Sequence, residues 1–153
     1  DIQAEDFGAI LIRFKNGAIG IVEGTACVYP KNLEETLSIF GGTGTAVIGG
    51  LAVNRVQTWN FETPAPQDDE VAKINGTDPK DVYGSGHTPL YANYIHAIEN
   101  GVAPLVSGTE AITAMKIILA AYKSQKTGQP VKFDDLEFST LDMQDSDVRW
   151  HRG

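Results

Sequence analysis

The feature of this sequence that most limits its fold is a pair of apolar runs joined by a short polar turn. Residues 7–14 (FGAILIRF) and 18–30 (AIGIVEGTACVYP) flank Lys15, Asn16 and Gly17. Asn-Gly between two apolar runs is a strong hairpin signal, because both central positions of the favoured turn require a positive φ. We therefore predict an antiparallel hairpin whose turn places both Asn16 and Gly17 at positive φ.

Neither face of this hairpin is polar. Successive side chains of a strand point to opposite faces, which places Ala9 and Leu11 on one face and Ile10, Ile12 and Phe14 on the other. An antiparallel sheet with one solvated face normally alternates apolar and polar residues. If both faces are apolar, each must pack against another structural element to be removed from water. Helices of the same chain can cover one face, and we expect a second copy of the sheet to cover the other, giving a homodimer or homotetramer.

The glycine-rich stretch at residues 41–50 (GGTGTAVIGG) continues the strand pattern. Gly42 and Gly44 match the start of a dinucleotide-binding fingerprint, but Val47 occupies its third position and no helical pattern follows. A hairpin tip at residues 41–44, between strand-like residues 34–40 and 45–61, is the better interpretation, because the residues after it alternate like a strand. The first half of the chain is thus a meander of four or five antiparallel strands.

The second half is predicted to be helical. Residues 62–86 lack periodicity and indicate a long loop that leads to His87, followed by a helix capped by Thr88. Asn100-Gly101 ends this helix. Ser107 and Glu110 then have the capping-box spacing that starts a second helix, which runs to about Lys126. A short closing strand is predicted at residues 131–133.

Composition excludes several classes of function. The formal net charge of −8 and the lack of clustered Lys and Arg argue against nucleic-acid binding. Cys27 is the single cysteine, and the three histidines show no metal-ligand spacing, so neither a disulfide nor a metal site is predicted. No export signal or membrane-spanning run is present, and we expect a cytoplasmic protein. Because Asp1 leads almost directly into a strand-like run, the chain reads as a piece of a longer protein.

Residues 87–131 (HTPLYANYIHAIENGVAPLVSGTEAITAMKIILAAYKSQKTGQPV) resemble the C-terminal signature of the Gfo/Idh/MocA oxidoreductase family. The shared features are an Ala-Ile-x-x-Gly phrase, a Pro-x-Val-x-Gly link, an Ala-rich helix and Ser-x-x-x-Gly-x-Pro-Val. The first half, with FKNGAIGIVEGT, NLEETLSIFGGTGTAVI and WNF, is also similar to this family, nearest to nucleotide-sugar dehydrogenases that oxidise a UDP-linked amino sugar or its uronic acid.

The resemblance implies an α+β fold in which residues 1–153 form one substrate-binding and oligomerisation domain. Its open, largely antiparallel sheet would carry two or three helices on one face, as in the C-terminal domain of glyceraldehyde-3-phosphate dehydrogenase, with the other face used for oligomerisation. NAD or NADP would be bound mainly by an N-terminal Rossmann domain that this chain lacks. The family's catalytic lysine and histidine would lie upstream of Asp1, so no catalytic residue is assigned here and the fragment alone is expected to be inactive.

Five residues are the candidates for binding substrate, because polar groups at sheet ends and helix entrances suit the positioning of a sugar. They are Tyr29, Asn32, Arg55, His87 and Tyr91. A purely structural role as solvated loop residues is the competing interpretation for each.

Other functions remain open within and beyond the family. An inositol-type dehydrogenase or an NAD-dependent glycosidase would share the architecture, since substrate choice lies in few side chains. A stand-alone sugar-binding or dimerisation module is a third reading. A glycine fingerprint and a Glu-Lys-Pro motif upstream of Asp1 would separate the enzymes from the module.

Overall fold

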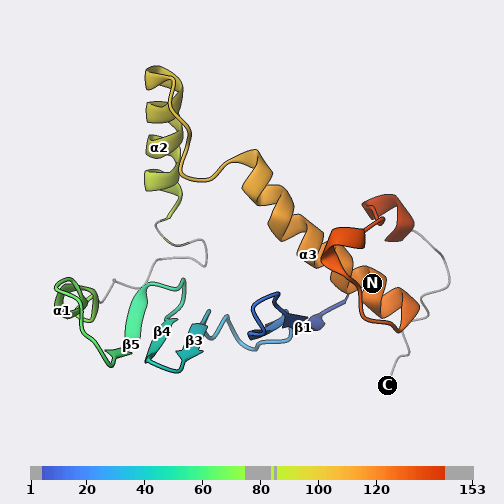
Figure 1. The fold of residues 1–153 in the computed structure, drawn as a ribbon, viewed down its shortest axis with the longest axis horizontal. Coiled ribbons are helices and arrows are strands. Elements are labelled where there is room, and N and C mark those ends of the chain that lie inside the picture. The colour runs from blue at the N-terminus through green and yellow to red at the C-terminus, as the bar shows by residue number, and fades with distance from the viewer. Residues whose placement is uncertain (1–4, 75–83, 85, 144–153) are drawn as a thin grey trace. The chain divides into compact units, whose positions relative to one another are not determined.

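The chain has an α+β fold (Figure 1), and the computed structural model describes residues 5–74, 84 and 86–143. Its five described strands form two antiparallel sheets, one of two strands and one of three. The chain divides into two compact units, residues 1–92 and 93–153. All five strands lie in the first unit. The predicted meander is therefore confirmed in its strands, which are split between two sheets. The packing of helices on one sheet face stays a prediction.

The first sheet is the predicted hairpin of β1 (Phe7–Arg13) and β2 (Ile19–Thr25), with Leu11 opposite Ile21. The Gly17 amide donates to the Phe14 carbonyl (3.0 Å), and Gly17 has φ 90°. Asn16 does not have a positive φ, so the predicted turn type is wrong. The turn has the pattern of a type I turn followed by a glycine bulge. Asn16 instead contributes its side chain, whose Oδ1 accepts from the Ala18 amide (3.1 Å).

The second sheet has the order β3 (Leu37–Gly41), β4 (Gly44–Gly49) and β5 (Arg55–Phe61). Gly41 pairs with Gly44, so the glycine-rich stretch is a hairpin tip, as predicted. Val47 pairs with Thr58 while Ile48 pairs with Val56, which leaves one extra residue in β5. Such a bulge bends the strand and increases its local twist.

The segment predicted as a long loop contains a short helix, α1 (Asp68–Val71). The Asp68 carboxylate holds this turn against the sheet: Oδ1 accepts from Trp59 Nε1 (2.9 Å) and Oδ2 accepts from the Ala65 amide (2.6 Å). These hydrogen bonds, first that from Ala65 and then that from Trp59, lower the pKa of Asp68. The prediction of loop throughout residues 62–86 is thus wrong here, and residues 75–83 and 85 lie outside the described part.

The helix that follows, α2 (His87–Asn100), begins before the predicted Thr88 cap, and the Leu90 amide donates to the Gly86 carbonyl (3.2 Å). Its end is as predicted. Gly101 has φ 63°, and the Val102 amide donates to the Ala97 carbonyl (3.0 Å). This pairing is the Schellman pattern, which satisfies carbonyls that the helix end would leave without a partner.

The second long helix, α3 (Gly108–Thr127), confirms the predicted capping box. Ser107 Oγ accepts from the Glu110 amide (3.3 Å), and Glu110 Oε2 accepts from the Ser107 amide (2.7 Å). Gly128 closes the helix at φ 65°. The predicted strand at residues 131–133 is wrong: a 3-10 turn at Phe133–Asp135 begins there, and a second follows at Thr140–Met143. No described strand lies in this unit to pair with these residues.

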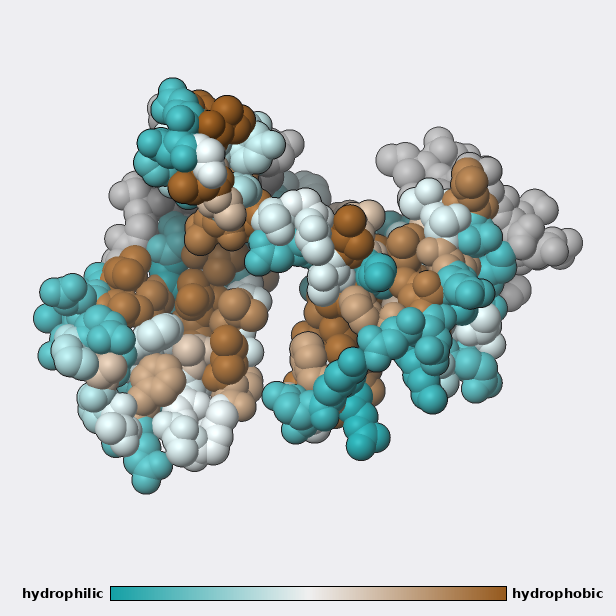
Figure 2. Space-filling view, turned by 45° about the horizontal axis from the view of Figure 1, so that its top comes forward, coloured by the Kyte–Doolittle hydropathy of each residue, from teal (hydrophilic) through white to brown (hydrophobic). Residues whose placement is uncertain are grey.

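Buried side chains are very few in the described residues. Only Ala46 and Ala97 are classed as buried hydrophobic residues there, whereas Leu11, Ile21 and Phe40 are each more than 70% exposed. Figure 2 shows broad apolar areas on the surface of the chain. Leu11, Ile21 and Phe40 therefore have little cover from the described residues of their own unit.

Candidate functional site

The turn between β4 and β5, residues 50–54, has the most unusual backbone in the described part of the chain. Gly50 has φ 100°, and a Cβ there would lie 2.3 Å from Asn54 Oδ1, so only glycine fits. Val53 has φ 51° and is the one described non-glycine residue with a positive φ. For a β-branched residue this conformation is strained. Strain of this kind gathers at binding and catalytic sites, which makes the turn a candidate site.

Three separate segments meet at this turn. The Glu35 amide donates to the Gly50 carbonyl (2.9 Å), which brings the segment before β3 to the turn. Arg55 follows the turn directly, and its Cγ lies 3.3 Å from where a Gly50 Cβ would be. A Cβ on Gly84 would lie 3.0 Å from the Ala52 Cβ, so the segment before α2 also passes close by.

The structure therefore places three of the five predicted binding residues on segments that converge. Asn32 lies shortly before Glu35, Arg55 is the first residue of β5, and His87 follows Gly84 at the start of α2. Asn32, Arg55 and His87 are all exposed. A role for them in binding substrate stays a prediction.

The two tyrosines are placed differently. Tyr91 lies one turn after His87 on α2, so the two side chains share a face of that helix. Its side chain is 64% exposed. Tyr29 is 95% exposed, lies in the segment between β2 and β3, and is joined to Pro30 by a cis peptide bond. Among the described residues, no hydrogen bond or ring contact joins Tyr29 to the β4–β5 turn, and its role also stays a prediction.

Sequence reasoning missed the turn itself. It selected Arg55 but not Val53 or Asn54, although Asn54 shapes the turn through the hydrogen bond that its Oδ1 accepts from the Ala52 amide (3.4 Å). The available signal was Gly49-Gly50 followed by Asn54 between two apolar runs, which is typical of a turn. Nothing in the sequence marks Val53, because valine disfavours the conformation that it adopts.

The described residues offer no group of three or more His, Cys, Asp or Glu side chains that could hold a metal ion. The hydrogen bond with Asp6, and to a lesser extent desolvation and the charge of Asp6, raise the pKa of the exposed Cys27 thiol. A thiol with a raised pKa is a poor nucleophile because the thiolate is the reactive form. Across the same residues, we find no helix with the length and apolarity to traverse a bilayer.

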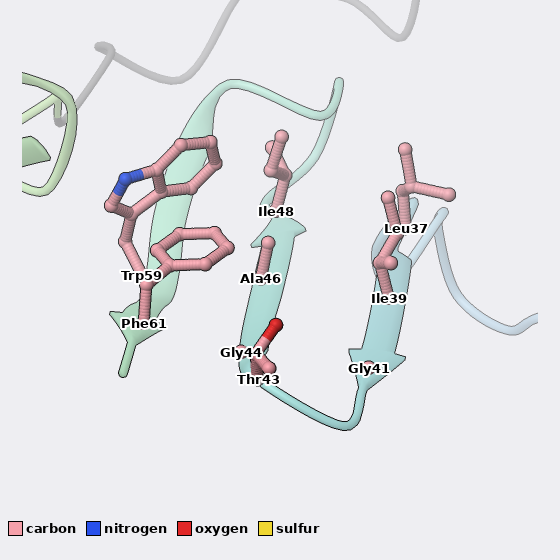
Figure 3. Close-up of a pocket in the computed structure, with 9 residues that line it drawn as sticks. All are labelled: Leu37, Ile39, Gly41, Thr43, Gly44, Ala46, Ile48, Trp59 and Phe61. Carbon is pink, nitrogen blue, oxygen red and sulfur yellow. The ribbon is translucent and has the colours of Figure 1, made fainter. Parts of the chain in front are cut away.

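A hollow of about 380 Å³ lies on one face of the three-stranded sheet. Figure 3 shows the residues that line it, which come from all three strands and from the turn between β3 and β4: Leu37, Ile39, Gly41, Thr43, Gly44, Ala46, Ile48, Trp59 and Phe61. The Trp59 and Phe61 rings meet edge to face with centroids 5.2 Å apart. With Thr43 as the single hydroxyl in this lining, the hollow suits apolar packing rather than a sugar or phosphate.

The glycine-rich residues of the β3–β4 hairpin do not fit a nicotinamide dinucleotide. Gly42 and Gly44 belong to the β3–β4 hairpin, whereas a dinucleotide fingerprint needs a glycine turn between a strand and a helix whose N-terminus faces the pyrophosphate. Polar side chains near the β4–β5 turn could instead contact a substrate.

The fold is that of an oxidoreductase C-terminal α/β domain, and comparison with family models agrees. Residues 1–133 match the family described as "Oxidoreductase family, C-terminal alpha/beta domain". The chain belongs to the Gfo/Idh/MocA oxidoreductase family, which confirms the resemblance found in the sequence. Comparison with curated proteins finds no significant match.

Two solved dehydrogenases are similar to the chain. One is WlbA from Bordetella pertussis in complex with NADH and UDP-GlcNAcA, which is 33% identical with a TM-score of 0.71 over 86% of this chain and 36% of that one. The other is WlbA from Chromobacterium violaceum with the same two ligands, also 33% identical, with a TM-score of 0.70 over 84% of this chain and 35% of that one. The chain thus spans about a third of the length of these relatives.

Proposed function

We propose that this chain is the substrate-binding and oligomerisation domain of an NAD(P)-dependent dehydrogenase that acts on a nucleotide-linked sugar. The observation that supports this most strongly is the 33% identity, over 86% of the chain, to a dehydrogenase in complex with NADH and UDP-GlcNAcA. In the proposed enzyme a nicotinamide cofactor held by another part of the full-length protein would supply the hydride acceptor. This chain's own residues bind and orient the sugar.

The β4–β5 turn provides the framework for binding. The Arg55 guanidinium suits an anionic group of the substrate, a diphosphate or a uronate carboxylate, because its planar donors match such oxygens. Asn32, His87 and Tyr91 provide neutral donors and acceptors for sugar hydroxyls, with Tyr29 as a further candidate. Catalytic groups and the cofactor site belong to another part of the full-length protein, and the domain alone is inactive.

The test uses the full-length protein with NAD or NADP and a panel of substrates, with formation of NADH or NADPH as the readout. UDP-N-acetylglucosaminuronate is expected to be oxidised, and Arg55→Ala is expected to raise its KM more than that of the coenzyme. Lys132→Ala, at an exposed position outside the segments that meet at the turn, serves as the control. Oxidation of an inositol, or NAD-dependent hydrolysis of a glycoside, would replace the proposal with the corresponding family activity. Sugar binding without any turnover would favour a stand-alone binding module.

Oligomerisation is supported by the exposed apolar strands. A domain of about 150 residues normally buries about 70% of the surface of its unfolded chain, whereas only two residues of the described part are buried hydrophobic residues. Sharing the sheet with a second copy would remove much of this apolar surface from water. A sedimentation mass of the full-length protein equal to one chain would contradict this part of the proposal. The cytoplasmic location inferred from the sequence is kept as part of it.

A further inference from the structure

Two side chains from the start of β5 occupy the space that glycines leave at the end of β4. A Cβ on Gly49, the last residue of β4, would lie 2.8 Å from Cδ and 3.2 Å from Oε1 of Gln57, so the Gln57 carboxamide rests directly on the Gly49 backbone. A Cβ on Gly50 would lie 3.3 Å from Cγ of Arg55. Arg55 and Gln57 therefore have their positions because β4 leads into two glycines.

The bulge in β5 places Gln57 on the same face of the sheet as Arg55. Arg55 pairs with Gly49, and side chains of directly paired residues lie on one face. Since the Gln57 carboxamide lies against Gly49, it shares this face. Trp59 instead pairs with Ala46, three residues before Gly49, and lines the hollow on the other face (Figure 3). The bulge thus turns Gln57 away from the apolar hollow and towards Arg55, as bulges beside functional sites commonly do.

The backbone between these two side chains is fixed on both sides. Val56 pairs with Ile48 in β4, and its amide donates to the Ile74 carbonyl (3.1 Å) in the segment after α1. A guanidinium and a carboxamide therefore project from a short piece of strand that has neighbours at both edges. Polar groups held on a rigid strand are suited to positioning a ligand.

We propose that Gln57 is a specificity-determining residue of the proposed site and that its carboxamide forms hydrogen bonds with the acetamido group of the sugar. This inference rests on the proposed function and adds the residue that selects an N-acetylated substrate. An acetamido group offers one N–H donor and one carbonyl acceptor, and a glutamine carboxamide offers the complementary acceptor and donors. The two amides can form a pair of hydrogen bonds that a hydroxyl at the same sugar carbon does not reproduce.

The spacing of Arg55 and Gln57 suits a sugar that carries both an acetamido group and a carboxylate. Two residues of a strand span at most about 7 Å. In a 2-acetamido-hexuronate the two groups lie on opposite sides of the pyranose ring, so their separation is that of a ring with its substituents. Of the two anionic groups that suit the Arg55 guanidinium, this spacing favours the uronate carboxylate.

The test compares two substrates of the full-length protein, UDP-N-acetylglucosaminuronate and UDP-glucuronate, which differ in the acetamido group. Gln57→Ala removes two hydrogen bonds and is expected to lower kcat/KM for the acetamido substrate about tenfold, chiefly through KM. It should leave kcat/KM for UDP-glucuronate nearly unchanged, because that substrate lacks the group. Asn60→Ala removes a carboxamide from the far end of the same strand and serves as the matched control, with no change in preference expected.

Gly49→Ala perturbs the same contact from the other side. Gly49 has no positive φ, so alanine fits the backbone, and the nearest atoms that its Cβ would meet all belong to the end of the Gln57 side chain. By displacing the carboxamide, Gly49→Ala should reduce the preference for the acetamido substrate as Gln57→Ala does. In the Gln57→Ala background it should have no further effect on preference, because no carboxamide remains to be displaced.

The outcomes separate this inference from the proposed function. If the unaltered protein oxidises a nucleotide sugar but Gln57→Ala or Gly49→Ala leaves its substrate preference unchanged, only the inference is overturned. An effect of Gly49→Ala that persists in full in the double variant would also overturn it, since Gly49 would then act through the backbone rather than through Gln57. Failure of the unaltered protein to oxidise any nucleotide sugar would overturn the proposed function and this inference with it.

Discussion

Replacing Val53 by glycine tests whether the β4–β5 turn is strained, as its backbone indicates. Val53 has φ 51°, a left-handed conformation that costs of order 1–3 kcal/mol for a residue other than glycine. Glycine adopts it without this penalty. Glycine also gives the unfolded chain more freedom, which costs about 0.5–1 kcal/mol. The difference predicts that Val53→Gly raises the free energy of unfolding by about 1 kcal/mol.

A matched substitution separates strain relief from the general effect of adding glycine. Val22 lies in the middle of β2 and is 49% exposed, close to the 40% of Val53. Its backbone has no positive φ to relieve, and glycine within a strand is unfavourable. Val22→Gly is therefore expected to lower the free energy of unfolding by about 1 kcal/mol. The two variants should move in opposite directions.

Urea denaturation of the full-length protein, followed by circular dichroism, measures both changes. Similar slopes against urea concentration would show that the unfolded states are comparable. If Val53→Gly destabilises the protein as much as Val22→Gly does, the turn is not strained and the reason for selecting it as a site is lost. If the strain positions Arg55, Val53→Gly should also raise the KM for the nucleotide sugar while leaving that for the coenzyme unchanged.

Three further substitutions test other features of the structure. Ser107→Ala removes the cap of α3 and should lower the free energy of unfolding by about 1 kcal/mol, whereas Thr109→Ala should not; chemical denaturation measures both. Asp68 has a lowered pKa in the folded protein, so its contribution is present above the usual aspartate value of about 3.9 and lost as the pH falls through the folded pKa. Asp68→Asn should therefore flatten the acid side of the stability profile, which Asp69→Asn should leave intact. His87→Ala should raise the KM for the nucleotide sugar, and an unchanged kcat/KM would remove His87 from the site.

The end of α2 and the start of α3 were predictable because each is determined by neighbours along the chain. The Ser107–Glu110 box closes within one helical turn, and Gly101 terminates α2 through hydrogen bonds to residues of that same helix. Glycine suits the end of α2 because it adopts a positive φ without strain. Serine suits the start of α3 because its hydroxyl accepts a hydrogen bond from a backbone amide of the first turn. Such signals are complete in the sequence, and the structure reproduces them.

The β turns were less predictable, since several turn types satisfy the same residues. Asn16-Gly17 is compatible with a two-residue turn and with a longer turn that ends in a glycine bulge. The structure adopts the second, in which Asn16 acts through its side chain. Asp68 shows a related difficulty: α1 is held by a hydrogen bond from Trp59 in a separate strand. No pattern within residues 62–74 contains that information.

The candidate site was predictable only in part. Asn32, Arg55 and His87 were selected because they lie at ends of elements, and the segments that carry them converge on one turn. The convergence depends on register and on close approaches at Gly50 and Gly84, which involve residues distant in sequence. Sequence periodicity gives the ends of elements but does not say which ends meet.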